Sequence, residues 1–124
     1  MKYLIMIYPD PAKLDAMPDS EFKTTMRHCL AFADDLRARG TILDSQMLQP
    51  PPTAKTLRKQ RGKNVVLDGP FAETKEVLAG YNVVEAASMD EALKIAGEFP
   101  WTDIGAIEVR PILEMSEMRA RVAG

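Results

Sequence analysis

The 124-residue chain is poor in the side chains that most metal sites and disulfides require. It contains one cysteine, Cys29, and one histidine, so neither an internal disulfide nor a zinc-type Cys/His cluster can form. Long hydrophobic runs are also lacking, because the apolar segment at residues 1–8 is far too short for a signal-peptide core or a membrane span. We therefore expect a protein of a reducing, cytoplasmic environment that does not cross a membrane.

An excess of charge of one sign is missing as well. The net charge is −2 and the pI is about 5.4, so the overall field does not favour nucleic acid. One basic cluster occurs at residues 55–63, but no aromatic side chain is interleaved there for base stacking. We expect no direct nucleic-acid binding and interpret the cluster as the protected edge of a hairpin.

The motifs of the common cofactor-dependent enzymes are absent too. The chain has no glycine-rich phosphate loop, no metal-ligand cluster and no Ser or Cys nucleophile motif. We therefore expect no cofactor, which leaves cofactor-independent chemistry or simple binding of a small-molecule ligand.

What is present is an ordinary globular composition, with 46% hydrophobic and 27% charged residues. We expect residues 1–124 to form a single domain that buries a core without disulfides or metals. Strand and helix patterns alternate along the chain. They predict strands at 2–8, 41–48, 77–85 and 106–110, helices that start at Pro18 and Ser88, a hairpin over 56–67, and a short terminal helix from Met115.

This order predicts an α+β fold, a ferredoxin-like βαββαβ protomer with an inserted hairpin. Between the first strand and the first helix, the prolines at positions 9 and 11 predict an extended loop. The first strand is apolar on both faces, although two helices can cover only one face of the sheet. We therefore predict a homodimer in which two sheets pack face to face.

The stretch Asp68–Glu76 is the densest in special residues. An apolar strand leads an acidic side chain into a Gly69–Pro70 corner, which is followed by Phe71 and a charged patch. On local physics this is either a turn with a polar tip or a corner that positions Asp68 and Phe71 for a site. In the first case, Asp68 would accept backbone N–H groups at the corner, and Glu73 and Glu76 would pair with Lys75 or nearby basic residues on the surface.

The single histidine, His28, lies on the first long helix at the margin of its apolar stripe. Two interpretations stay open. His28 is either a half-exposed surface residue or a general acid/base, because an unperturbed imidazole titrates near neutral pH.

The stretch DGPFAETKE at Asp68–Glu76 resembles, without a mismatch, the signature of the YCII-related (YciI-like) proteins. Segments at 2–8, 48–51 and 107–111 resemble the same family in the same order. The resemblance implies a dimeric α+β barrel and a His/Asp site, to which His28 and Asp68 would correspond. It also implies a link with extracytoplasmic-function sigma factors.

Two functions are possible hypotheses. A third hypothesis is that the signature has a purely structural role. In the first, an enzyme or ligand binder uses His28 as acid/base and Asp68 to orient it, which requires the two side chains to converge on one site. The expected ligand-contacting residues are aromatic: Phe71, Phe32, Tyr3 and Tyr81. In the second, the protein is a non-catalytic regulator that binds a sigma factor.

Overall fold

The computed structural model describes residues 1–72 and 75–124, which form a mixed α+β fold. In chain order the elements are β1 (Lys2–Pro9), α1 (Pro11–Ala16), α2 (Asp19–Ala38), β2 (Ile42–Met47), β3 (Lys55–Gln60), β4 (Lys63–Asp68), β5 (Gly80–Glu85), α3 (Met89–Gly97), β6 (Gly105–Pro111) and α4 (Met115–Ala123). One-turn 3-10 helices lie at Pro51–Thr53 and Pro100–Asp103. The predicted strands, the hairpin and the three predicted helices, α2, α3 and α4, are therefore present.

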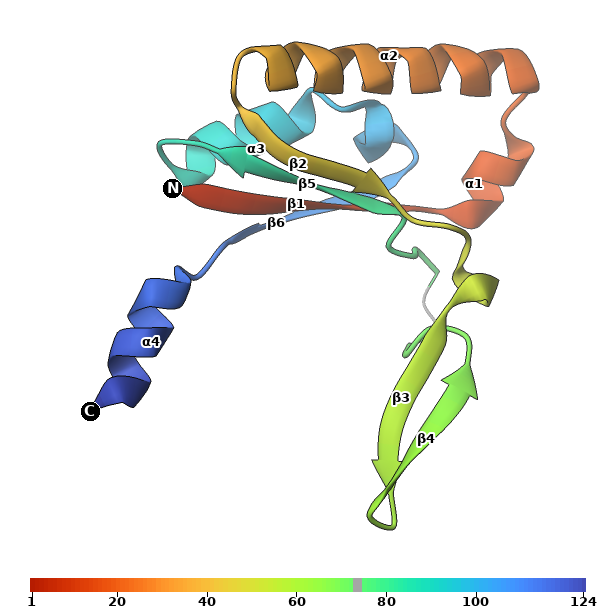
Figure 1. The fold of residues 1–124 in the computed structure, drawn as a ribbon. Helices are drawn as coiled ribbons and strands as arrows, with labels where there is room; N and C mark the ends of the chain where they lie inside the picture. Colours follow the sequence, from red (N-terminus) through yellow and green to blue (C-terminus); the bar gives the residue numbers. More distant parts are fainter. Residues whose placement is uncertain (73–74) are drawn as a thin grey trace.

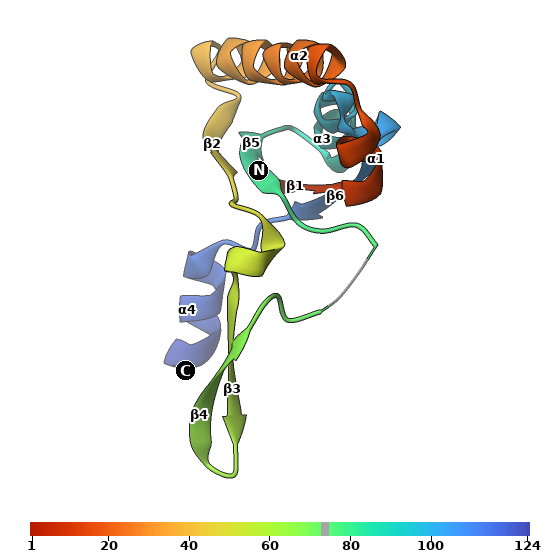
Figure 2. The same ribbon diagram turned by 90° about the vertical axis from the view of Figure 1, so that its right-hand side faces the viewer.

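Four strands form one antiparallel sheet in the order β2-β5-β1-β6. Helices α2 and α3 lie on one face of this sheet (Figures 1 and 2). The β3–β4 hairpin and α4 project beyond the opposite face, from the two ends of the strands. The sheet thus has a helix-covered face and an open face, and the hairpin and α4 act as two arms beside the open one.

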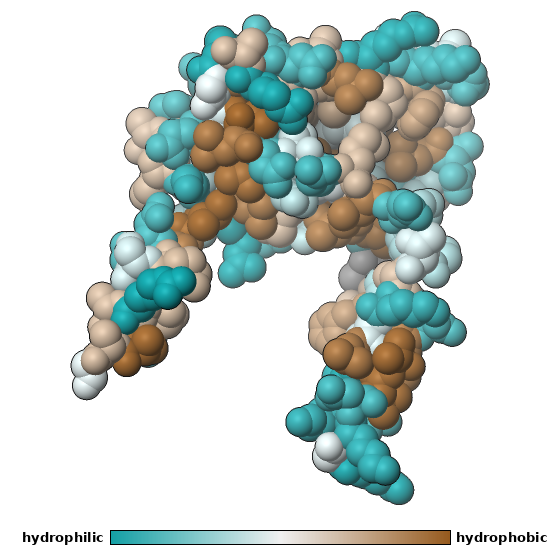
Figure 3. Space-filling view, in the orientation of Figure 1, coloured by the Kyte–Doolittle hydropathy of each residue, from teal (hydrophilic) through white to brown (hydrophobic). Residues whose placement is uncertain are grey.

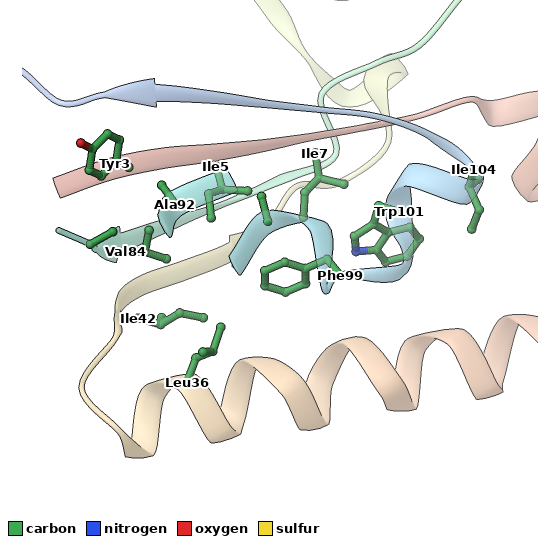
Figure 4. Packing of buried hydrophobic residues seen from close by; sticks show 12 residues of the cluster. Tyr3, Ile5, Ile7, Leu36, Ile42, Val84, Ala92, Phe99, Trp101 and Ile104 are labelled. Atoms are coloured by element: carbon green, nitrogen blue, oxygen red, sulfur yellow. The ribbon is translucent and has the colours of Figure 1, made fainter. Parts of the chain in front are cut away.

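The hydrophobic core lies between the helices and the sheet. Alternate residues of β1 point into it, which explains why Tyr3, Ile5 and Ile7 are buried. Figure 4 shows Phe99 and Trp101 between α2 and the sheet, and Leu36 near one end of α2. The Pro100–Asp103 turn therefore supplies part of the packing beneath α2.

Local sequence signals place both core helices as predicted. Helix α2 begins after Pro18 with acidic residues in its first turn, and the chain leaves it through Gly40, whose φ is +76°. Helix α3 begins at Ser88, whose side chain accepts a hydrogen bond from the Glu91 N–H at 3.2 Å.

The segment after β1 differs from the prediction, because Pro11 starts the short helix α1 instead of continuing a loop. Proline suits the first helical position, where an N–H has no partner. Asp10 completes this start, since its Oδ1 accepts a hydrogen bond from the Ala12 N–H at 3.0 Å. Proline disfavours helix only for the residue before it, so Asp10 is extended while Pro11 itself is helical.

The two arms expose apolar side chains. The hairpin turns tightly at Arg61–Gly62, where both residues have positive φ. Figure 3 shows apolar surface on both arms. The exposed large apolar residues are Leu57, Val66 and Leu67 on the hairpin and Met115 and Val122 on α4.

Within the described ranges, no helix has the length and apolar character that crossing a membrane requires.

Candidate functional site

An apolar cleft of about 250 Å³ lies between α2 and the sheet, and is here called the α2–sheet cleft. It lies where the ends of β1 and β2 and the start of β5 meet the middle of α2. Most of its lining is apolar. The lining residues are Ile7, Pro9, Leu14, Phe22, Met26, Cys29, Leu30, Ala33, Ser45, Gln46, Met47, Ala79, Gly80, Tyr81, Asn82, Phe99 and Trp101.

A buried polar pair stands out in this lining. Asn82 is only 3% exposed, and the Ser45 hydroxyl donates a hydrogen bond to its Oδ1 at 2.6 Å. The two residues are directly paired across β2 and β5, on the face that the helices cover. Because a buried amide must be hydrogen-bonded to avoid a desolvation cost, this pair is a specific feature of the cleft.

The close approach of β2 to β5 depends on Gly80. A Cβ atom at this position would lie 2.9 Å from the carbonyl oxygen of Gln46, closer than real contacts allow. Glycine here therefore brings the strands together behind the cleft and keeps Ser45 within reach of Asn82.

Cys29 lies on the α2 side of the cleft. The indole N–H of Trp101 donates a hydrogen bond to its Sγ at 3.3 Å. Burial raises the pKa of the Cys29 thiol above its ordinary value, and this hydrogen bond only partly opposes the shift. The thiol is therefore mostly protonated at neutral pH and is a poor nucleophile.

None of the described residues that line the cleft is an Asp, Glu, Lys, Arg or His. Nor do three metal-ligating side chains of the His, Cys, Asp and Glu types come together in the parts of the chain that the structure describes. The arrangement can hold an uncharged organic molecule against apolar walls and offer it the Asn82 amide and the Ser45 hydroxyl.

His28 lies on the exposed side of α2, away from the cleft-lining side of that helix. Its Nε2 is 3.4 Å from the carbonyl oxygen of Glu98 at the end of α3. Within one chain this places His28 against α3, where it is a surface residue.

Asp68 lies at the end of β4, on the hairpin arm. It is exposed and forms an ion pair with Lys55, its register partner on β3. Helix α2 and the hairpin lie on opposite sides of the sheet in both views (Figures 1 and 2). Within one chain His28 and Asp68 therefore do not converge, and a pair between them would need two subunits.

Phe71 follows Asp68 on the same arm and is 73% exposed, with the Arg58 guanidinium 4.8 Å from its ring centroid. The corner itself is held by the hairpin base. The Gly69 N–H donates to the Ala54 carbonyl at 2.8 Å, and the Thr56 hydroxyl donates to the Gly69 carbonyl at 2.8 Å. The first half of the signature is thus a hairpin corner, in which Asp68 pairs with a lysine side chain.

The other expected ligand-contacting aromatics are dispersed. Phe32 packs edge-to-face on Phe99 with ring centroids 4.8 Å apart, so it supports a cleft wall from behind. Tyr3 is a core residue. Tyr81 borders the cleft, but the strand alternation turns its side chain to the open face, where its hydroxyl donates to Asp44 at 3.1 Å. That hydrogen bond is the main cause of the raised pKa of Tyr81.

The second half of the signature contacts the end of β1. Lys75 Nζ lies 3.6 Å from the buried carboxylate of Asp10, and the Val77 N–H donates to the Pro9 carbonyl at 3.3 Å. The predicted pairing of Glu73 lies outside the described residues. Lys75 therefore pairs with a carboxylate that directly follows Pro9, a residue of the cleft lining.

Sequence reasoning missed Asp10, Ser45 and Asn82. One signal was available for Asn82: it is a polar residue in β5 two positions from Val84, on the face that should point into the core. Nothing in the sequence showed that Ser45 would lie beside it.

Comparison with known proteins identifies the family. Residues 1–116 match the YCII-related domain. An uncharacterised protein of Rhizobium meliloti (strain 1021) is 36% identical over 114 residues, which cover 90% of this chain and 92% of that protein. The fold is also similar to the 5-chloro-2-hydroxyhydroquinone dehydrochlorinase of Burkholderia phenoliruptrix AC1100 in complex with 2,5-dihydroxybenzoquinone. The TM-score is 0.54 at 20% identity, over 94% of this chain and 98% of that one. The chain belongs to the YCII-related family.

Proposed function

We propose that this protein binds a small organic molecule in the α2–sheet cleft. The observation that carries the proposal is the apolar cleft with the buried Ser45–Asn82 pair in its wall. A neighbour of similar fold is a dehydrochlorinase in complex with 2,5-dihydroxybenzoquinone, which supports a small-molecule role for this architecture.

Filling the cleft tests the site. Ala33 lines it, so Ala33→Leu adds three carbon atoms inside the cavity, whereas Ala31 lies on the exposed side of α2 and Ala31→Leu is the matched control. The probes are toluene, phenol and benzoate at millimolar concentration. Binding is read from the fluorescence of Trp101 and from protection of Cys29 against iodoacetamide.

We expect at least one probe to protect Cys29 in the wild type and in Ala31→Leu, and none to protect it in Ala33→Leu. The proposal is wrong if no probe binds to the wild type, or if Ala33→Leu binds as the wild type does.

We also propose that the protein is a homodimer, a dimeric α+β barrel of ferredoxin-like protomers. The sheet order β2-β5-β1-β6 supports this, as does an open face that carries Leu4, Met6 and Val83. An isolated hairpin and a nine-residue helix are only marginally stable in water, so both arms need a covering surface. A His28–Asp68 acid/base pair would require this second subunit.

Sedimentation velocity at micromolar concentration tests the dimer. Val83→Glu places a charge on the open face and should give monomers, whereas Leu93→Glu, at an exposed position of α3, should leave the dimer intact. A monomeric wild type would contradict the proposal. The regulatory role with a sigma factor stays a prediction from the family resemblance.

A further inference from the structure

We infer that the ligand of the α2–sheet cleft is an uncharged compound about the size of one substituted ring, anchored through a single hydroxyl or carbonyl oxygen on Asn82. This inference rests on the proposed function and names the chemical class that the same site selects. Three properties of the cleft carry it: its charge, its size and shape, and the state of the Asn82 amide.

The charge of the lining excludes ions. None of the described lining residues is ionisable near neutral pH, because the Cys29 thiol is protonated and the others are apolar, aromatic, amide or hydroxyl groups. A carboxylate or ammonium group that enters such a site loses its hydration and finds no opposite charge. Neutral molecules are therefore preferred over their charged analogues.

The size and shape of the lining favour a ring. An apolar cavity of roughly 150 Å³ is already enough to bind benzene, and this cleft has about 250 Å³. Phe22, Phe99 and Trp101 contribute aromatic side chains to the lining, and Met26 adds a thioether. Aromatic and sulfur contacts of these kinds favour a flat ring over a flexible chain.

The Asn82 amide supplies the anchor. Its Oδ1 accepts from Ser45, which orients the side chain so that the N–H groups are the donors available to a ligand. A ligand oxygen, as hydroxyl or carbonyl, can accept from this amide. A site that holds a buried polar group discriminates strongly against an analogue without the matching oxygen, because the group is then left without a partner.

Three probes separate these properties. Toluene supplies the ring alone, phenol adds the oxygen while it remains neutral, and benzoate adds a charge. We expect phenol to bind about tenfold or more tightly than both other probes in titration calorimetry. Tighter binding of benzoate than of phenol would overturn the inference.

Asn82→Leu removes the amide while keeping a side chain of similar volume. The chain has one other asparagine, Asn64 on the exposed hairpin, so Asn64→Leu is the matched control. Phenol should lose its advantage over toluene in Asn82→Leu and keep it in Asn64→Leu. If Asn82→Leu does not fold, Ser45→Ala removes the orienting hydroxyl. Ser45→Ala should weaken phenol several-fold while toluene is unchanged.

The variants also separate failure of this inference from failure of the proposed function. If Ala33→Leu abolishes binding of all probes but Asn82→Leu and Ser45→Ala leave the preference for phenol unchanged, the cleft binds ligands and the anchor is wrong. If Ala33→Leu changes nothing, the site itself is wrong and the inference fails with it.

Discussion

A methyl group added at Gly80 should push apart the two strands behind the cleft. The new Cβ would lie 2.9 Å from the Gln46 carbonyl oxygen and 3.5 Å from the Met47 Cα. A carbon–oxygen contact normally needs about 3.3 Å or more, so the backbone of β2 must move by a few tenths of an ångström. This shift also strains the nearby Ser45–Asn82 hydrogen bond.

Overpacking of this kind costs roughly 1–3 kcal/mol, and the lower entropy of the unfolded chain offsets about 0.4–1 kcal/mol of it. We therefore expect Gly80→Ala to lower the free energy of unfolding by about 1–2 kcal/mol. For a chain of this size, that lowers the Tm by about 4–8 °C. Urea and thermal unfolding, followed by far-UV circular dichroism, measure both quantities.

Gly97 is the matched control, because it lies in α3 and a Cβ there would meet nothing within 4 Å. Gly97→Ala should raise stability by roughly 0.5–1 kcal/mol through helix propensity. The reasoning is refuted if Gly80→Ala is as stable as the wild type, or if both substitutions change stability in the same direction.

Two further predictions concern single side chains. Because burial raises the pKa of Cys29, the folded state holds the thiol proton more tightly than the unfolded chain does, and stability falls as pH rises above the pKa of the unfolded thiol. Iodoacetamide should therefore alkylate native Cys29 at pH 8 at least about tenfold more slowly than the urea-unfolded chain. Equal rates would contradict a half-buried, protonated thiol. Ser88→Ala removes the side-chain acceptor at the start of α3 and should lower the free energy of unfolding by about 1 kcal/mol in urea. Ser20→Ala, in the first turn of α2, should lower this free energy less. Equal losses would contradict the capping role of Ser88.

Local signals in the sequence were sufficient for the strands and the three helices α2, α3 and α4 in their order, although they did not predict α1. The positions of Pro18, Gly40 and Ser88 mark the ends of helices through backbone geometry and capping, which depend on a few neighbouring residues. The Arg61–Gly62 turn and the alternation in β6 are local in the same sense. The signature at Asp68–Glu76 identified the family, and residues 1–116 match it.

The candidate site depends on tertiary structure. Ser45 and Asn82 are 37 residues apart and meet only because β2 pairs with β5 in one particular register. Cys29 and Trp101, 72 residues apart, meet only because α2 packs over the turn that follows α3. Contacts of this range depend on sheet order and helix packing, which no local pattern specifies.

The same reason explains why the expected His28–Asp68 pair does not form within one chain. The sequence determined that His28 lies on a helix and that Asp68 ends a hairpin strand, and both placements hold. The tertiary fold decided which face of the sheet each element occupies. Helix α2 buries its apolar stripe against one face, whereas the hairpin projects beyond the opposite face. The signature therefore identifies the family, whereas the cleft and its Asn82 amide were placed by strand register and helix packing.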